Sequence, residues 1–183
     1  MLLQSETADT QGMYPQDLCT SCGLCCDGTL FTSVALGPQE QRARDSLARF
    51  SASFTDRGES ETFCQPCVAL EIRKCRIYET RPEKCRSFRC DLLKDFQNGV
   101  VRLDDALDAV ETAFRLRNER DASAESVGIE ASGSCASDFL MRVDTLLEST
   151  SEAEKSKYGQ LAVNSLALQL YISQHFLRKS NGD

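Results

Sequence analysis

The sequence predicts a mainly α-helical protein with short irregular and β pieces, in which a helical C-terminal half packs on a cysteine-rich N-terminal half. Its 183 residues correspond to one compact unit, since a typical domain has about 150 residues. Nine of the ten cysteines lie between Cys19 and Cys90, and apolar residues recur at helical spacing after residue 100. We therefore expect a flexible tail over 1–17, a cysteine-cluster domain over 18–99 and a helical extension over 100–183.

The N-terminal half predicts few and short elements. Apolar residues interspersed with Thr and Ser over 29–36 predict a short strand. Pro38 suits the first turn of a helix that runs to about residue 50, and we expect a polar loop over 51–63. A second helix should begin near Pro82 and end at Asn98-Gly99. Its apolar face would consist of Cys85, Phe88, Leu92 and Phe96.

Three apolar stripes predict helices in the C-terminal half. The first stripe runs from Leu103 to Phe114 and is followed by a Ser- and acid-rich linker over 121–134. The second stripe lies between Phe139 and Leu147. A third, longer helix should start at the capping-box pattern Ser151-x-x-Glu154 and run through Phe176. Each stripe needs a partner, so we expect these helices to pack on the cysteine-rich half.

The ends and the charge of the chain limit the functions to be considered. No basic region followed by an apolar run opens the sequence, and no apolar stretch reaches the roughly 20 residues of a membrane span, so we expect a soluble cytoplasmic protein without membrane contact. A net charge of −7 argues against a general nucleic-acid binder. Residues 73–95 are locally basic, however, which leaves a small nucleic-acid patch with Tyr78, Phe88 and Phe96 as an alternative.

The strongest local signal is a run of four closely spaced cysteines, Cys19-x2-Cys22-x2-Cys25-Cys26. A two-residue spacer lets the chain fold back so that two sulfurs reach one metal ion, and Gly23 provides the flexibility that this needs. Neighbouring side chains in an extended segment point to opposite faces. Cys25 and Cys26 are therefore predicted to serve different metals, or different irons of one cluster.

The remaining ligands come from later in the sequence, as Cys67, Cys75, Cys85 and Cys90, with Cys64 as a further candidate. Cys85 and Cys90 would lie about 140° apart on a continuous helix, so one site cannot hold both unless the helix is broken. This also favours two neighbouring sites. The arginines of the same segment should neutralise the thiolates through charge-assisted hydrogen bonds. They are Arg76, Arg81, Arg86 and Arg89.

Other uses of the cysteines fit the pattern less well. A disulfide framework lacks a secretory signal, and C-x2-C spacing is tight for ordinary bridges. Hydrophobic cores are not normally built from as many as nine unliganded cysteines within 72 residues. A thioredoxin-type redox pair would need a neighbouring strand and helix and would leave the other cysteines unexplained. Thiolates bind both zinc and iron, so the sequence leaves open zinc, iron and an iron-sulfur cluster.

The motif resembles that of the YkgJ-type cysteine-cluster family, which is described as a zinc- or iron-chelating domain. The resemblance covers 19–90 and includes the string Cys75-Arg76-Ile77-Tyr78-Glu79-Thr80-Arg81-Pro82-Glu83-Lys84-Cys85-Arg86. It implies eight ligands, Cys19, Cys22, Cys25, Cys26, Cys67, Cys75, Cys85 and Cys90, and does not include Cys64. The motif is also similar to the cysteine-rich part of flagellin lysine methylases, which implies an iron-sulfur alternative. Whichever metal binds, Tyr78 and Phe88 are expected to shield the sulfurs from water.

Two residues outside the motif could also carry chemistry. The single histidine, His175, falls late in the last helix, where a cation suits the helix dipole, and we expect a structural or surface role. Cys135 falls at a helix start, where the dipole could activate its thiol, although a buried free cysteine is the favoured interpretation. The sequence thus predicts a metal-binding protein with no identifiable catalytic residue. Its role is either a zinc module that presents a surface to a protein partner or an iron-sulfur enzyme that acts on a protein or peptide.

Overall fold

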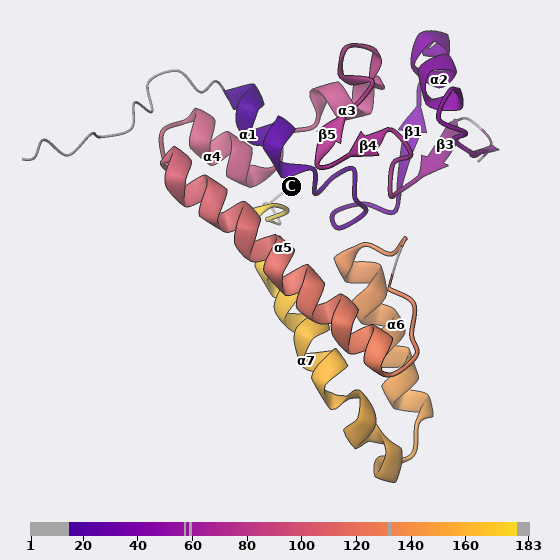
Figure 1. Cartoon of the computed structure of the whole chain (residues 1–183), viewed down its shortest axis with the longest axis vertical. Coiled ribbons are helices and arrows are strands. Elements are labelled where there is room, and N and C mark those ends of the chain that lie inside the picture. The colour runs from indigo at the N-terminus through magenta and orange to yellow at the C-terminus, as the bar shows by residue number, and fades with distance from the viewer. Residues whose placement is uncertain (1–14, 57, 59, 132, 179–183) are drawn as a thin grey trace, which may run out of the picture.

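A computed structural model describes residues 15–56, 58, 60–131 and 133–178 (Figure 1). Short helices and strands form the N-terminal half, and three long helices extend from it as an elongated arm. The predicted class, mainly helical with the cysteines in the first half, is confirmed. The predicted tail over 1–14 falls outside the described residues. Helix α1 (Pro15–Cys22) begins before the predicted tail ends, so residues 15–17 are helical. None of the described helices is long and apolar enough to cross a membrane.

A three-stranded antiparallel sheet lies next to the cysteines. It has the order β1-β3-β2, with β1 (Ser33–Leu36), β2 (Phe54–Asp56) and β3 (Glu61–Cys64). The pairing of Val34 and Phe54 with Phe63 aligns apolar side chains across all three strands. The predicted loop over 51–63 is therefore wrong. Within it, Thr62 and Phe63 pair with Ala35 and Val34 of β1, far earlier in the sequence, and β2 pairs with β3, which a local pattern does not reveal.

The helix α2 (Gln41–Ala48) follows Pro38 as predicted and packs beside the sheet. Together they form what we call the second core, in which Leu47 and Phe63 are almost fully buried. The remaining members of this core are Leu36, Ala43, Ala69 and Ile77. Burying a leucine or phenylalanine side chain stabilises the fold by about 1.5–3 kcal/mol, so the contribution of this small core to the free energy of unfolding is modest.

The segment after the sheet is a series of tight turns and short helices. A hairpin joins β4 (Leu70–Glu71) to β5 (Lys74–Cys75), and a single 3-10 turn follows over Tyr78–Thr80. The predicted continuous helix from Pro82 is instead two helices, α3 (Glu83–Ser87) and α4 (Asp91–Gln97). The break occurs because Phe88 and Cys90 adopt extended backbone conformations, and the Cys90 sulfur caps α4 by accepting the Leu93 N–H.

The arm consists of α5 (Leu103–Ser126), α6 (Ala136–Ser149) and α7 (Glu152–His175), with α7 running back along α5 (Figure 1). The start of α7 is confirmed, although the Ser151 hydroxyl bonds the Glu154 carboxylate and caps no backbone N–H. The predicted linker over 121–134 is wrong for its first six residues. They continue α5 because Ala124 is buried in a third core with Phe139, Val143 and Leu161.

The first and largest core joins the two halves. It contains Leu24 and Leu92 from the N-terminal half, together with Val110, Leu168 and Phe176 from the arm. Main-chain hydrogen bonds reinforce the junction, from the Asp91 N–H to the Phe176 carbonyl and from the Ala136 N–H to the Thr29 carbonyl. The arm is thus packed on the cysteine-rich half through a shared core.

Candidate metal centre

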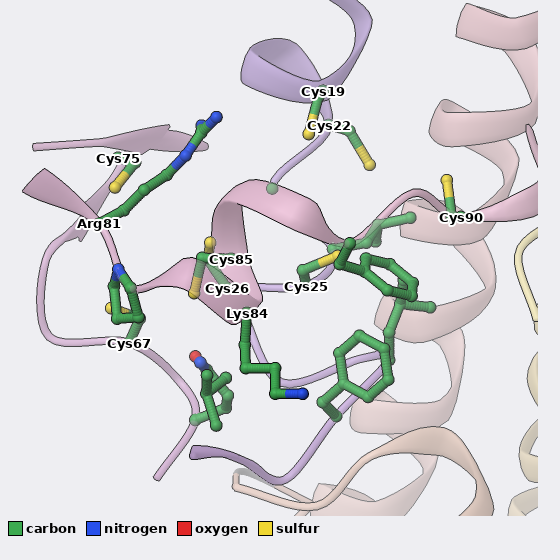
Figure 2. A pocket seen from close by; sticks show the side chains of 18 of the residues that line it. Cys19, Cys22, Cys25, Cys26, Cys67, Cys75, Arg81, Lys84, Cys85 and Cys90 are labelled. Atoms are coloured by element: carbon green, nitrogen blue, oxygen red, sulfur yellow. The ribbon is translucent and has the colours of Figure 1, made fainter. Parts of the chain in front are cut away.

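A cavity of about 490 Å³ lies in the N-terminal half, and all eight predicted ligand cysteines line it (Figure 2). They come from α1, the turn that follows it, the loop after β3, the strand β5, the helix α3 and the N-terminus of α4. The remaining lining is mostly apolar. Phe31 and Phe88 contact each other edge to face, with ring centroids 4.9 Å apart, and close part of the cavity wall.

Helix α1 and Gly23 position the first two cysteines. Cys19 and Cys22 are three residues apart in the last turn of α1, so they lie on one face of the helix. Gly23 then ends the helix with a φ of +73°, and a Cβ at this position would lie 3.2 Å from the Cα of Arg73. Only glycine meets both the left-handed backbone conformation and the close approach of the β4–β5 hairpin.

The turn after Gly23 carries Cys25 and Cys26. It is closed by hydrogen bonds from the N–H groups of Cys26 and Asp27 to the Gly23 carbonyl, each 2.9 Å long. The Cys26 carbonyl accepts the Cys67 N–H at 2.7 Å, which joins the two cysteine segments through their main chains. Cys25 and Cys26 are therefore held by different neighbours although they are adjacent in sequence.

Backbone N–H groups point at several of the sulfurs. The sulfurs of Cys22, Cys67 and Cys75 each accept a hydrogen bond from the N–H two residues later, and these bonds lower the thiol pKa. The Cys90 sulfur accepts the Leu93 N–H at 3.4 Å. Such donors stabilise a thiolate more than a thiol, so the local backbone fits the ionised form that binds metals.

Burial acts in the opposite direction and dominates. It raises the pKa of Cys22, Cys25, Cys26 and Cys90 above the ordinary value of 9.0, and raises that of Cys85 to about 12. Neighbouring thiolates raise these pKa values further, because like charges repel. In the absence of a bound cation, the buried thiols therefore remain protonated at neutral pH.

The mutual effects of the sulfurs divide them into two groups. Besides burial, the pKa of Cys25 is raised most by Cys22 and Cys19, and that of Cys26 by Cys67, Cys75 and Cys85. We call Cys19, Cys22, Cys25 and Cys90 the first sulfur group, and Cys26, Cys67, Cys75 and Cys85 the second sulfur group. The two groups are in contact electrostatically, since Cys19 also raises the pKa of Cys26 and Cys75, and Cys26 raises that of Cys25.

Arg81 is the predicted arginine that lies at the sulfurs. Its positive charge lowers the pKa of Cys75 and Cys85, and its guanidinium stacks 3.6 Å from the centre of the Tyr78 ring. Both residues line the cavity. The Arg81 Nε is buried and has no hydrogen-bond partner among the described residues. An unpaired buried donor beside sulfurs fits a centre that carries negative charge, as thiolates bound to a divalent metal do.

The other predicted arginines do not line the cavity. Arg76 pairs with Glu71, Arg86 pairs with Glu83, and Arg89 donates to main-chain carbonyl groups. Two other basic residues, Arg73 and Lys84, line the cavity instead, and Figure 2 shows Lys84 among its side chains. In the sequence, Arg73 and Lys84 are marked only by their place in the locally basic segment 73–95. Which of them face the sulfurs depends on the turns between them, and the sequence does not specify these.

Two ion pairs connect the cavity to the arm. Asp27, which follows Cys26, pairs with Arg117 of α5, and both side chains are largely buried. Arg73, in the β4–β5 turn, pairs with Glu111 and stacks 3.6 Å from the centre of the Phe114 ring. Helix α5 therefore holds the turn that carries Cys25 and Cys26, and it also holds the hairpin that carries Cys75.

The remaining candidates lie away from the cavity. Cys64 is exposed at the end of β3, and Cys135 is buried at the N-terminus of α6 beside Ser137. His175 ends α7 and its ring lies 4.3 Å from that of Tyr171. None of the three lines the cavity. Phe96, part of the alternative nucleic-acid patch, packs against the first core.

All ten cysteines are free thiols. Within the described part of the chain, no three cysteine, histidine, aspartate or glutamate side chains are already arranged to hold a metal ion. The eight cysteines instead line one cavity together. The donor set nevertheless matches what zinc and iron bind, because both metals take four thiolates.

The raised thiol pKa values predict how the stability of the metal-free protein depends on pH. The unfolded chain ionises its cysteines near pH 9, whereas the folded chain keeps the buried thiols protonated. Stability should therefore be fully present below pH 9 and be lost as the pH rises, by about 1.4 kcal/mol per pH unit for each such thiol. Urea denaturation from pH 7 to 10 measures this slope. Cys25→Ser should reduce the slope by the contribution of one thiol; a slope equal to that of the wild type would contradict the explanation.

Comparison with known proteins agrees with the motif. The family model named CxxCxxCC, described as "Putative zinc- or iron-chelating domain", matches residues 18–105, and this region contains all eight cysteines of the cavity. The resemblance drawn from the cysteine spacing is thereby confirmed. No curated protein and no solved structure matches the chain.

Proposed function

We propose that this protein binds zinc or iron through the eight cysteines that line the cavity. The observation that carries the proposal is the convergence of eight thiols from six separate segments, spread over residues 19–90, on one mostly apolar cavity. Chance packing of small apolar side chains would not bring every cysteine of the motif to one place while leaving Cys64 and Cys135 outside it. The matched zinc- or iron-chelating domain supports the same activity.

Metal binding would change the state of the thiols. The eight cysteines would hold such an ion as thiolates after losing their protons, and its positive charge would offset the mutual repulsion of the buried thiolates. Arg81, Arg73 and Lys84 would offset the negative charge that remains on the metal-thiolate centre.

The identity of the metal separates two roles. A zinc centre would be structural and would hold the short elements as a surface for a protein partner. An iron-sulfur centre would support redox or modifying chemistry on a protein or peptide, and four thiolates suit such a cluster. In either case we propose a cytoplasmic location, because ten free thiols are stable in a reducing compartment.

Anaerobic purification followed by metal, sulfide and absorption analysis tests the proposal. A brown protein that absorbs near roughly 400 nm and releases sulfide identifies an iron-sulfur centre. A colourless protein with stoichiometric zinc identifies the structural role. If the protein prepared without oxygen binds neither metal, and also fails to take up zinc or iron added under reducing conditions, the proposed function is wrong.

A further inference from the structure

We propose that the eight cysteines form two separate four-thiolate sites, one made by the first sulfur group and one by the second. This inference rests on the proposed metal-binding function and adds the ligand set of each site. Figure 2 shows Cys26 beside Cys85, on the side of the cavity where Cys67 and Cys75 lie, whereas Cys25 lies on the side of Cys22 and Cys90. The adjacent residues Cys25 and Cys26 therefore belong to different sites.

The division of the cores supports this division of the ligands independently. Cys22, Cys25 and Cys90 pack against the first core, which is formed by α1, α4, α5 and α7. Cys67, Cys75 and Cys85 pack against the second core, which is formed by the sheet and α2. No cysteine of either trio packs against the core of the other. Each group of sulfurs is therefore held by its own part of the fold.

The two cysteines not assigned by core packing are placed by their backbones. Cys19 lies one helical turn before Cys22 on the same face of α1, so it belongs with the first group. The Cys26 carbonyl accepts the Cys67 N–H at 2.7 Å, which ties Cys26 to the second group. Each site then has four thiolates, the number that closes a tetrahedral zinc site or holds one iron-sulfur cluster.

Each proposed site has a positively charged arginine beside it. Four thiolates and one divalent ion carry a net charge of about −2. Arg81 lies beside Cys75 and Cys85 of the second group, and Arg73 lies beside Cys22 of the first group. One buried or partly buried arginine therefore accompanies each site.

The two sites would stabilise different parts of the molecule. The first site would connect α1 to α4, and through the first core to α5 and α7. The second site would hold the β4–β5 hairpin and α3 on the sheet and α2. Loss of one metal should therefore loosen one core while the other keeps its own metal.

Loading the full-length protein with cadmium-113 tests the division, because cadmium replaces zinc at thiolate sites and is observed directly by NMR. The wild type is expected to bind two equivalents and to give two resonances without cadmium-cadmium coupling. Cys22→Ser should lose one resonance and Cys67→Ser the other. Hydrogen exchange should become at least about tenfold faster in α4 and the start of α5 for Cys22→Ser, and in β1 and β3 for Cys67→Ser. The exposed Cys64→Ser is the matched control and should keep both resonances.

Other results of this experiment would reject either the division into two sites or metal binding itself. A single resonance, coupling between two cadmium nuclei through a shared sulfur, or loss of the same resonance in both variants would overturn the division while leaving metal binding intact. Failure of the wild type to bind cadmium, zinc or iron would instead reject the proposed function. The wild-type spectrum tests the number of sites and the absence of a shared sulfur even where a variant fails to fold, and the variants test which cysteines belong to each site.

Discussion

Cys25→Ser and Cys85→Ser are each expected to lose bound metal and to lower the melting temperature by roughly 6–20 °C. Both sulfurs line the cavity, and burial together with neighbouring thiolates raises the pKa of each thiol. A serine hydroxyl is a poor ligand, so the remaining thiolates would repel one another inside the fold. Breaking such a buried charged assembly costs about 3–5 kcal/mol, and each kcal/mol shifts the melting temperature of a protein of this size by about 2–4 °C.

The measurement is metal content together with thermal unfolding of protein purified without oxygen. Cys135→Ser and Cys64→Ser are the controls. Cys135 precedes α6 as its N-cap residue, a position that serine favours, and Cys64 is exposed. Both controls should keep their metal and their melting temperature. Full metal occupancy in both Cys25→Ser and Cys85→Ser would show that the ligands are assigned wrongly.

Phe176→Ala is expected to destabilise the protein by about 3–5 kcal/mol, the usual cost of removing a buried phenylalanine, or roughly 6–20 °C in melting temperature. Phe176 is 1% exposed at the end of α7, where it fills the first core between the two halves. Its carbonyl also accepts the Asp91 N–H at the start of α4. The substitution should therefore weaken the attachment of the arm to the cysteine-rich half.

Leu170→Ala provides the matched control on the same helix, because Leu170 is 50% exposed. It should change the melting temperature by less than about 2 °C, since exposed substitutions cost less than about 0.5 kcal/mol. Thermal unfolding followed by circular dichroism compares the two variants. Equal stabilities would mean that the arm does not depend on the first core. A stable, folded 100–183 fragment would lead to the same conclusion.

The cysteine motif could be interpreted from the sequence because its information is local. C-x2-C spacing restricts where two sulfurs can lie, and all eight predicted ligands line one cavity. The alternation of side chains predicted for Cys25 and Cys26 assumed an extended segment, whereas the structure places both residues in the hydrogen-bonded turn after Gly23. The helices of the arm were also predictable, since the apolar stripes of α5, α6 and α7 repeat over several turns.

Features that depend on distant partners were not predictable. The residues of β2 and β3 alternate polar and apolar side chains over only three or four positions, and they form strands because β3 pairs with the distant β1 and β2 then pairs with β3. The helix predicted from Pro82 breaks before Cys90 and so directs Cys85 and Cys90 to different cores. Arg81 faces the sulfurs, whereas Arg86 pairs with Glu83, and no spacing rule separates these two arginines.

The sequence by itself determined the residue types, their spacing and the helical periodicity, and these specify a cysteine-rich half followed by a helical arm. Only the tertiary structure decided which sulfurs lie together, which basic groups face them and how α5 holds the cysteine-bearing turns through Asp27–Arg117 and Arg73–Glu111. The physical reason is the range of the interactions. Propensity, capping and ligand spacing act over a few residues, whereas packing in the first core joins residues from Leu18 to Phe176.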